Sequence, residues 1–215
     1  MVKVVAFDFD GTMALSFNLI NKCIKEVFEE NNLYMSEEEF FSYYGPNEIG
    51  IFKHALGDEL GEKVFSRYLE LYKKYHKEYL PSLAKDVTKV IDYLKENNIH
   101  VVLLTGRSLE STLISLNEFN MMNTFEKLYV GSEEGVNKPS NFKQLFKDYN
   151  VSNNEVIYIG DSVKDIYSCK EVGVKILSIY LEQGESRLDK LKENNDLVFT
   201  DYLSLLDKLK ELIKQ

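Results

Sequence analysis

Short runs of apolar and β-branched residues recur along the chain, and most are continuous rather than alternating with polar residues. Continuous runs of this length are typical of strands that are covered on both faces. Between them, apolar residues recur every three or four positions, which is the spacing of a helix with one buried face. This alternation predicts an α/β fold in which helices flank a parallel sheet. The predicted strands cover residues 2–7, 99–104, 128–130, 156–159 and 174–179.

Residues 16–80 interrupt this alternation, because they show several helical patterns in a row and no convincing strand. The clearest helical patterns cover residues 17–28 and 60–75. Gly45-Pro46 and Gly57 mark the breaks between helices, since proline lacks an amide hydrogen and glycine favours turns. We therefore predict an α-helical cap inserted after the first strand. The predicted organisation is a cap at 16–80 and a core at 1–15 and 81–215, with a last helix near 205–213.

Two carboxylates, Asp8 and Asp10, follow the first predicted strand and precede Gly11-Thr12. A β-strand turns successive side chains to opposite faces, so both carboxylates belong in the turn beyond its carboxyl end. In an open α/β sheet, this edge is where ligands bind. The pattern is typical of an aspartate nucleophile beside an acid/base partner, although an ordinary turn before a helix also favours Asp, Gly and Thr.

Three further polar segments follow, or lie within reach of, other predicted strand ends. They are Leu104-Thr105-Gly106-Arg107, Asn137-Lys138-Pro139 and Gly160-Asp161-Ser162-Val163-Lys164-Asp165. With the segment around Asp8, they resemble in order the four motifs of the haloacid dehalogenase-like superfamily. The resemblance spans roughly residues 2–180 and implies a Rossmann-like core with a helical cap of the C1 type. The second aspartate indicates the phosphoryl-transfer enzymes of the superfamily, in the branch of phosphoglycolate phosphatases and β-phosphoglucomutase.

The resemblance implies a role for each motif residue. Asp8 would attack phosphorus and form an aspartyl-phosphate, while Asp10 would act first as general acid and then as general base. The Thr105 hydroxyl and the Gly106 amide would bind phosphate oxygens. Lys138 would offset the charge that builds on those oxygens in the transition state.

Carboxylates beside a phosphate group also imply a cation, and hard oxygen ligands suit Mg²⁺. By resemblance, the metal ligands are Asp8, Asp161 and the backbone carbonyl of Asp10, with Asp165 supporting them. Asp161 and the serine after it also suit the start of a helix. Arg107 is left outside the predicted site, because an exposed arginine after a turn needs no function.

The composition limits the partners of the chain. A net charge of −9 opposes binding to nucleic acid or to an anionic membrane, whereas a small phosphorylated metabolite needs only local positive charge. Cys23 and Cys169 lie outside any Cys/His cluster, which indicates reduced thiols. The first residues show no leader pattern, and no apolar run approaches the ~20 residues that span a bilayer. We expect a cytoplasmic monomer or homodimer.

The predicted cap is expected to close over the site and select the leaving group. Its preferred specificity element is the turn Gly45-Pro46-Asn47-Glu48, because a rigid loop between cap helices could face the core. The other polar candidates in the cap are Asn18, Lys22, Tyr43, Tyr44, Lys53, His54 and Arg67, each of which also fits an ordinary solvated or packed position. His76 and His100 are expected to be structural.

The sequence thus favours a Mg²⁺-dependent phosphatase acting on a small phosphomonoester. Phosphoglycolate, sugar phosphates, nucleoside monophosphates and pyrophosphate are the candidate substrates, although Ala14 and Leu15 stand where phosphoglycolate phosphatases often carry an aspartate. A phosphomutase of the β-phosphoglucomutase type has the same motifs and stays open. A phosphonate hydrolase is disfavoured, because no cap lysine lies in a Schiff-base signature. A catalytically silent binding protein is disfavoured, because every motif residue is present.

Overall fold

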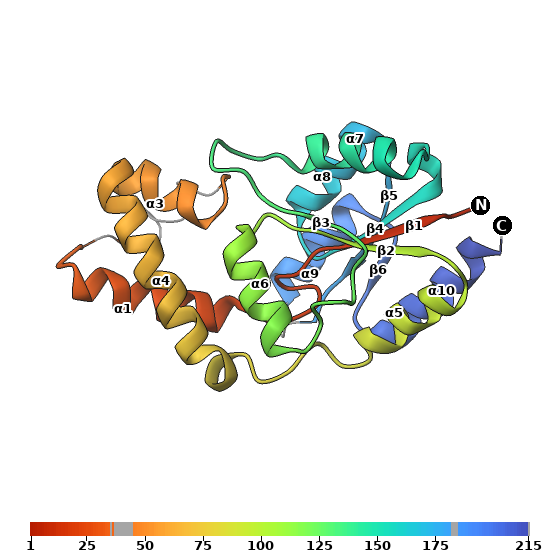
Figure 1. The fold of residues 1–215 in the computed structure, drawn as a ribbon. Coiled ribbons are helices and arrows are strands. Elements are labelled where there is room, and N and C mark those ends of the chain that lie inside the picture. Colours follow the sequence, from red (N-terminus) through yellow and green to blue (C-terminus); the bar gives the residue numbers. More distant parts are fainter. Residues whose placement is uncertain (35, 37–44, 182–184, 215) are drawn as a thin grey trace.

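The computed structural model describes residues 1–34, 36, 45–181 and 185–214. Six strands form one parallel sheet in the order β3-β2-β1-β4-β5-β6, so the first strand lies near its centre (Figure 1). The strands are β1 (Val4–Phe7), β2 (His100–Leu104), β3 (Leu128–Tyr129), β4 (Val156–Gly160), β5 (Lys175–Ile179) and β6 (Val198–Phe199). The described α-helices are α1 (Phe17–Glu30), α3 (Glu48–Leu56), α4 (Asp58–Tyr79), α5 (Val87–Glu96), α6 (Leu109–Glu118), α7 (Lys138–Tyr149), α8 (Val163–Val172), α9 (Glu185–Asn194) and α10 (Tyr202–Ile213). The predicted α/β fold is confirmed.

Strand β1 shows how one short segment serves both layers of the core. It pairs in parallel with β2 on one side and with β4 on the other. Val5 and Phe7 join the hydrophobic core on one face of the sheet, while Val4 and Ala6 join the core on the opposite face. Burial on both faces explains the continuous apolar run in the sequence.

Helices cover both faces of the sheet. Helices α5 and α10 pack on one face, where Val90 and Leu205 belong to the same core as Phe7 (Figure 1). Helices α7 and α8 cover the other face, through residues such as Phe142 and Ile166. These layers leave the carboxyl ends of the strands open for a site.

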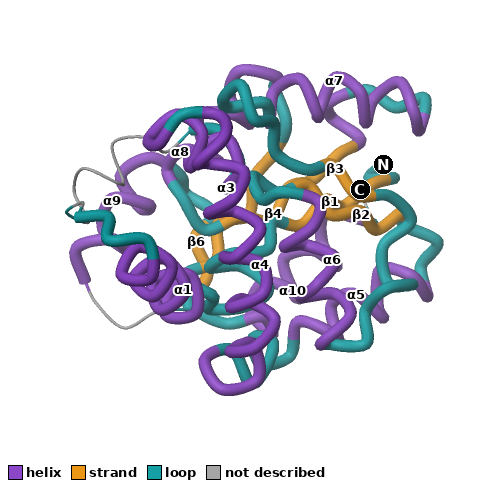
Figure 2. Tube along the Cα trace, turned by 60° about the vertical axis from the view of Figure 1, so that its left-hand side comes forward, coloured by secondary structure: helices purple, strands orange, loops and turns teal. Residues whose placement is uncertain are grey.

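Helices α1, α3 and α4 lie beyond those carboxyl ends, and Figure 2 shows α3 and α4 side by side at the front of the molecule. Their interior is aromatic: the Tyr68 ring lies 5.5 Å from Phe52 and 5.7 Å from Tyr72 between centroids. Gly57 separates α3 from α4 with a φ of 83°, a conformation that glycine adopts most readily. The described residues between 16 and 80 contain no strand, as the cap prediction requires, and the domain boundaries themselves remain a prediction.

Two details differ from the sequence prediction. Strand β1 begins at Val4 rather than at residue 2, and β6 is an additional edge strand that pairs with β5. Strand β6 has only two residues, too few to produce a recognisable pattern.

Cys23 and Cys169 are both buried free thiols. Within the described ranges, every helix falls short of the length and apolarity that crossing a bilayer requires.

Candidate active site

The carboxyl ends of β1, β2 and β4 lie next to one another in the sheet, and a cavity of about 350 Å³ opens beside them. Its lining includes Asp8 after β1, Thr105 after β2 and Asp161 after β4. The volume falls within the range of small-ligand pockets, ~300–1,000 Å³. The structure therefore brings together the residues that the sequence placed at three separate strand ends.

Asp8 is held where the β1 ladder ends. Its amide donates to the Ile159 carbonyl at 2.9 Å, which extends the pairing with β4 by one residue. One carboxylate oxygen accepts from the Phe9 amide at 2.8 Å, and the other accepts from the Lys138 ammonium at 2.8 Å. Burial raises the pKa of Asp8 to about 6, although Lys138 opposes this shift.

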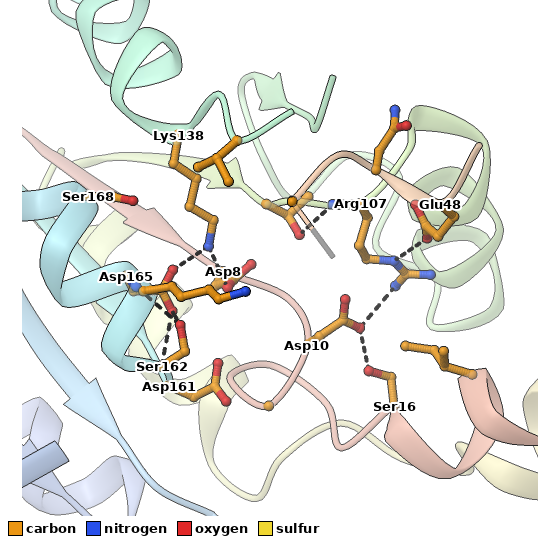
Figure 3. Close-up of a pocket in the computed structure, with 18 of the residues that line it drawn as sticks. Asp8, Asp10, Ser16, Glu48, Arg107, Lys138, Asp161, Ser162, Asp165 and Ser168 are labelled. Carbon is orange, nitrogen blue, oxygen red and sulfur yellow. Dashed lines mark hydrogen bonds and ion pairs between the residues drawn. The ribbon is translucent and has the colours of Figure 1, made fainter. Parts of the chain in front are cut away.

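Lys138 lies at the charged end of the cavity and contacts several polar groups there (Figure 3). Its ammonium donates to Asp8, to Asp165 and, at 2.7 Å, to the Tyr158 hydroxyl, which itself donates to the Leu104 carbonyl at 3.1 Å. The lysine is the first residue of α7, and its side chain is largely buried. The following proline suits this first turn of a helix, where no amide partner is needed.

Asp8, Asp161 and Asp165 form a buried acidic cluster, with one carboxylate oxygen of each within 4.8 Å of the others. Ser162 orients Asp165: its amide and hydroxyl donate to one carboxylate oxygen at 3.1 and 2.7 Å, which completes a capping box at the start of α8. Burial, together with the charges of Asp165 and Asp8, raises the pKa of Asp161 well above its usual value. The cluster thus brings three carboxyl groups together in a buried site, next to Lys138.

Two further residues lie against this cluster: Arg187 carried no recognised signal in the sequence, whereas Gly11 belongs to the first motif. Arg187 of α9 donates to Asp161 at 2.6 Å, although it lies 26 residues further along the chain. Gly11 adopts a φ of 70°, and a Cβ atom there would lie 2.2 Å from Asp161 Oδ2. Gly11 can therefore be explained by close packing as well as by turn geometry.

Asp10 points away from the acidic cluster (Figure 3). Its Oδ1 accepts a short hydrogen bond from the Ser16 hydroxyl and lies 3.8 Å from Arg107 Nη1. Among the described residues, the acidic cluster includes no Asp10 side-chain oxygen, so only its backbone carbonyl stays in the predicted metal set. Its carboxylate instead faces Ser16 and Arg107.

The segment after β2 places Thr105, Gly106 and Arg107 in the cavity wall. Thr105 is fully buried, and open space surrounds the position where Gly106 would carry a side chain. Arg107 is only 3% exposed, so its prediction as an exposed arginine was wrong. Its guanidinium donates to the Tyr72 hydroxyl at 2.6 Å and to the Ser111 carbonyl at 2.9 Å.

All four residues of the predicted specificity turn, Gly45-Pro46-Asn47-Glu48, line the cavity. Glu48 accepts from the Ser108 amide and the Ser111 hydroxyl, both at 2.5 Å, and Asn47 donates to the Gly131 carbonyl at 3.1 Å. These contacts join the start of α3 to the loops after β2 and β3.

The other charged cap candidates pair elsewhere. Lys22 pairs with Glu26, and Lys53 bridges Glu62 and Glu133. Arg67 pairs with Glu30 and Glu70. Asn18 and His54 are exposed outside the cavity lining, and Tyr43 and Tyr44 lie outside the described residues.

Both histidines expected to be structural occupy such positions. His76 is buried, lies 3.1 Å from the Ser115 hydroxyl and packs edge-on against Phe119, and burial lowers its pKa. His100 pairs with Glu126 at the surface.

The fold and the site define a class: an α/β enzyme with a carboxylate-rich pocket at the carboxyl edge of its sheet. The chain belongs to the haloacid dehalogenase-like hydrolase family, whose model matches residues 5–179. The predicted family is therefore confirmed.

The chain is similar along almost its whole length to curated phosphatases. PpaX of Clostridium perfringens, assigned as a pyrophosphatase, is 27% identical over 99% of both chains. The glyceraldehyde 3-phosphate phosphatase of Pyrococcus furiosus is 26% identical over 97% of this chain and 93% of its own. A solved HAD hydrolase of family IA, variant 3, from Entamoeba histolytica shares the fold, with a TM-score of 0.77 at 20% identity over 100% of both chains. The chain is thus a phosphatase of this family, as predicted.

Proposed function

We propose that the protein is a Mg²⁺-dependent phosphatase that hydrolyses a small phosphomonoester through an aspartyl-phosphate on Asp8. The observation that carries this proposal is the convergence of Asp8, Lys138, Asp161 and Asp165 at one end of a cavity that is large enough for a small ester. The substrate is a small phosphorylated metabolite, and the protein works in the cytoplasm as a monomer or homodimer.

In this mechanism, an Asp8 carboxylate oxygen attacks phosphorus and displaces the alkoxide of the ester. Asp10 donates a proton to that alkoxide, and its hydrogen bond from Ser16 orients it for the transfer. Water then attacks the aspartyl-phosphate while Asp10 takes up its proton, which releases inorganic phosphate and restores Asp8.

The transferred phosphate needs donors that are already in place. Lys138 supplies a buried positive charge beside Asp8, and the open space at Gly106 leaves its backbone accessible. Thr105 adds a hydroxyl in the same wall of the cavity. Preorganised donors of this kind stabilise the charge that develops on the phosphate oxygens.

The donor set fits Mg²⁺, which prefers several hard oxygen ligands. Asp8 and Asp161 would hold the ion together with the Asp10 carbonyl, and Asp165 would support them from its capping box. The crowding that raises the pKa of Asp161 also favours a cation there. Bound Mg²⁺ would neutralise the repulsion between the acidic cluster and the phosphate dianion.

The test is phosphate release from a panel of phosphomonoesters, pyrophosphate and hexose 1-phosphates, with Mg²⁺ and with EDTA. We expect metal-dependent release by the wild type and a loss of at least about 10³-fold in Asp8→Asn, which keeps the shape of the side chain. Wild-type turnover by this variant would refute the nucleophile assignment. Conversion of hexose 1-phosphate to the 6-phosphate without phosphate release would instead support the phosphomutase.

A further inference from the structure

The cavity has an apolar half next to the cap. Leu15, Phe17 and Val136 line it, although these side chains are 41%, 51% and 63% exposed. Ile20 and Ile51 contribute further apolar lining from α1 and α3. Large apolar side chains are normally buried, so a group of exposed ones in a single pocket marks a surface that a ligand covers.

The apolar wall spans the core and the cap. Val136 belongs to the loop before α7, and its Cγ2 would lie 3.7 Å from a Cβ atom built on Gly45 in the cap turn. Leu15 comes from the turn that leads into α1, and Phe17 is the first residue of that helix. A leaving group attached to a phosphate at Asp8 would therefore meet methyl groups and an aromatic ring from both sides.

The charges at this end disfavour an anionic leaving group. Asp10 and Glu48 both line the cavity, and each contributes a carboxylate. Arg107 is the cation nearest to them, but its donors bind Tyr72, Ser111 and Ser115.

The remaining cations that line the cavity serve its phosphate end. Lys138 bonds Asp8 and Asp165, and Arg187 bonds Asp161. Lys164 lies beside Asp165 in the first turn of α8 and forms no ion pair with a described residue. The segments outside the described ranges contain no Lys, Arg or His in their sequence, so they add no positive charge.

We infer that the preferred substrate is a phosphomonoester whose leaving group is uncharged and largely apolar, such as an alkyl or aryl alcohol. This inference rests on the proposed phosphatase function. It disfavours substrates that carry a second anionic group on the leaving side, such as phosphoglycolate or pyrophosphate. That group would lie against Glu48 and Asp10, whose nearest cation, Arg107, already donates its hydrogen bonds to other groups.

The test is kcat/KM of the Mg²⁺-loaded enzyme for ethyl, butyl, hexyl and phenyl phosphate beside phosphoglycolate and pyrophosphate. We expect kcat/KM to rise by about fourfold per added methylene until the cavity is filled. Hexyl and phenyl phosphate should exceed phosphoglycolate by at least about tenfold.

Two polar substitutions of similar shape test the wall itself. Leu15→Asn and Val136→Thr should each lower kcat/KM for hexyl phosphate by about five- to tenfold and leave phosphoglycolate nearly unchanged. Leu203→Asn is the matched control, since Leu203 is similarly exposed on α10 outside the cavity lining. It should change neither substrate.

Opposite results would overturn the inference. A preference for phosphoglycolate or pyrophosphate, or equal losses on all substrates in the wall variants, would do so while leaving the phosphatase intact, provided that Asp8→Asn abolishes release. Release that does not depend on Asp8 would refute the proposed function as well.

Discussion

The two ends of the pocket differ in where their charged side chains lie. At the core end, Asp8, Asp165 and Lys138 are buried and bond directly to one another. In the cap, Lys53 and Arg67 form ion pairs outside the pocket, and apolar side chains line the cavity instead. Burying charges is costly unless they are paired and hydrogen-bonded, so the core end is where the fold accepts a loss of stability for chemistry.

The two ends of the pocket also differ in how firmly their side chains are held in place. Strand ends and helix starts place the core carboxylates, and the side chains of Asp8 and Asp165 each accept a hydrogen bond from a backbone amide. The apolar wall contacts a ligand only through packing, which tolerates changes of shape. Substitutions at the core end should therefore alter activity most, and substitutions of cap surface charges should alter it least.

The largest expected effect comes from Lys138→Ala, which removes the cation from the core end. Asp8 and Asp165 would then lie buried without their shared partner. We expect phosphate release to fall by roughly 10²- to 10³-fold and the unfolding free energy to fall by about 3–5 kcal/mol. Steady-state kinetics and urea denaturation measure the two effects.

Lys143→Ala is the matched control, because Lys143 is an exposed residue of the same helix. It should leave both quantities unchanged within error. Wild-type activity and stability in Lys138→Ala would contradict the view that the core end depends on buried charge pairing.

Arg107→Met probes the buried cation where the core meets the cap. The substitution removes the guanidinium that donates to the Tyr72 hydroxyl and the Ser111 carbonyl. The unfolding free energy should therefore fall by about 3 kcal/mol. Arg67→Met, which breaks only surface pairs, should leave the urea midpoint unchanged. Equal shifts of the midpoint in the two variants would remove the distinction between buried and surface cations.

Sequence reasoning located the core end well because its residues follow strands directly. Asp8 and Asp161 each come after a continuous apolar run, and parallel strands bring such positions to one edge of the sheet. The pairing of β1 with both β2 and β4 then follows from the right-handed crossovers of an α/β fold. These are local or topological regularities, which a single sequence carries.

The remaining contacts depend on packing between distant segments. The burial of Arg107 requires α4 to supply Tyr72, and the partner of Asp161 comes from α9 as Arg187. Lys22 and Lys53 were reasonable cap candidates, because a solvated lysine and a ligand-binding lysine have the same local pattern on a helix. The pair of Lys22 with Glu26 has the i,i+4 spacing of one helix, whereas only the three-dimensional arrangement shows that Lys53 pairs with Glu133.

Two glycines with positive φ, Gly11 in the core and Gly57 in the cap, allow a direct comparison of the two parts. Gly11→Ala and Gly57→Ala should each lower the unfolding free energy by about 1–3 kcal/mol, because both place a side chain in a strained conformation. Only Gly11→Ala should also lower kcat, since its Cβ would displace Asp161, whereas no atom lies within 4 Å of the Gly57 position. Loss of activity in both variants would indicate that the turn at Gly57, between α3 and α4, also positions the active site.

The last prediction concerns the buried charge of Asp8 itself, whose effect appears only in the metal-free protein and depends on pH. Burial raises the pKa of this carboxyl from 3.8 to about 6, so between these values the folded state holds a proton that the unfolded state has lost. The unfolding free energy of the metal-free protein should therefore fall as the pH rises through this window.

Asp8→Asn has no proton to lose, and Lys138 keeps Asp165 as a partner in the variant. In EDTA, the variant should be more stable than the wild type at pH 7 by about 3 kcal/mol, and the two should converge below pH 4. Urea denaturation at several pH values measures the difference. If the unfolding free energies of the two proteins changed with pH in parallel, the buried Asp8 carboxylate would not destabilise the fold. The two ends of the pocket would then differ in geometry but not in the energetic cost of buried charge.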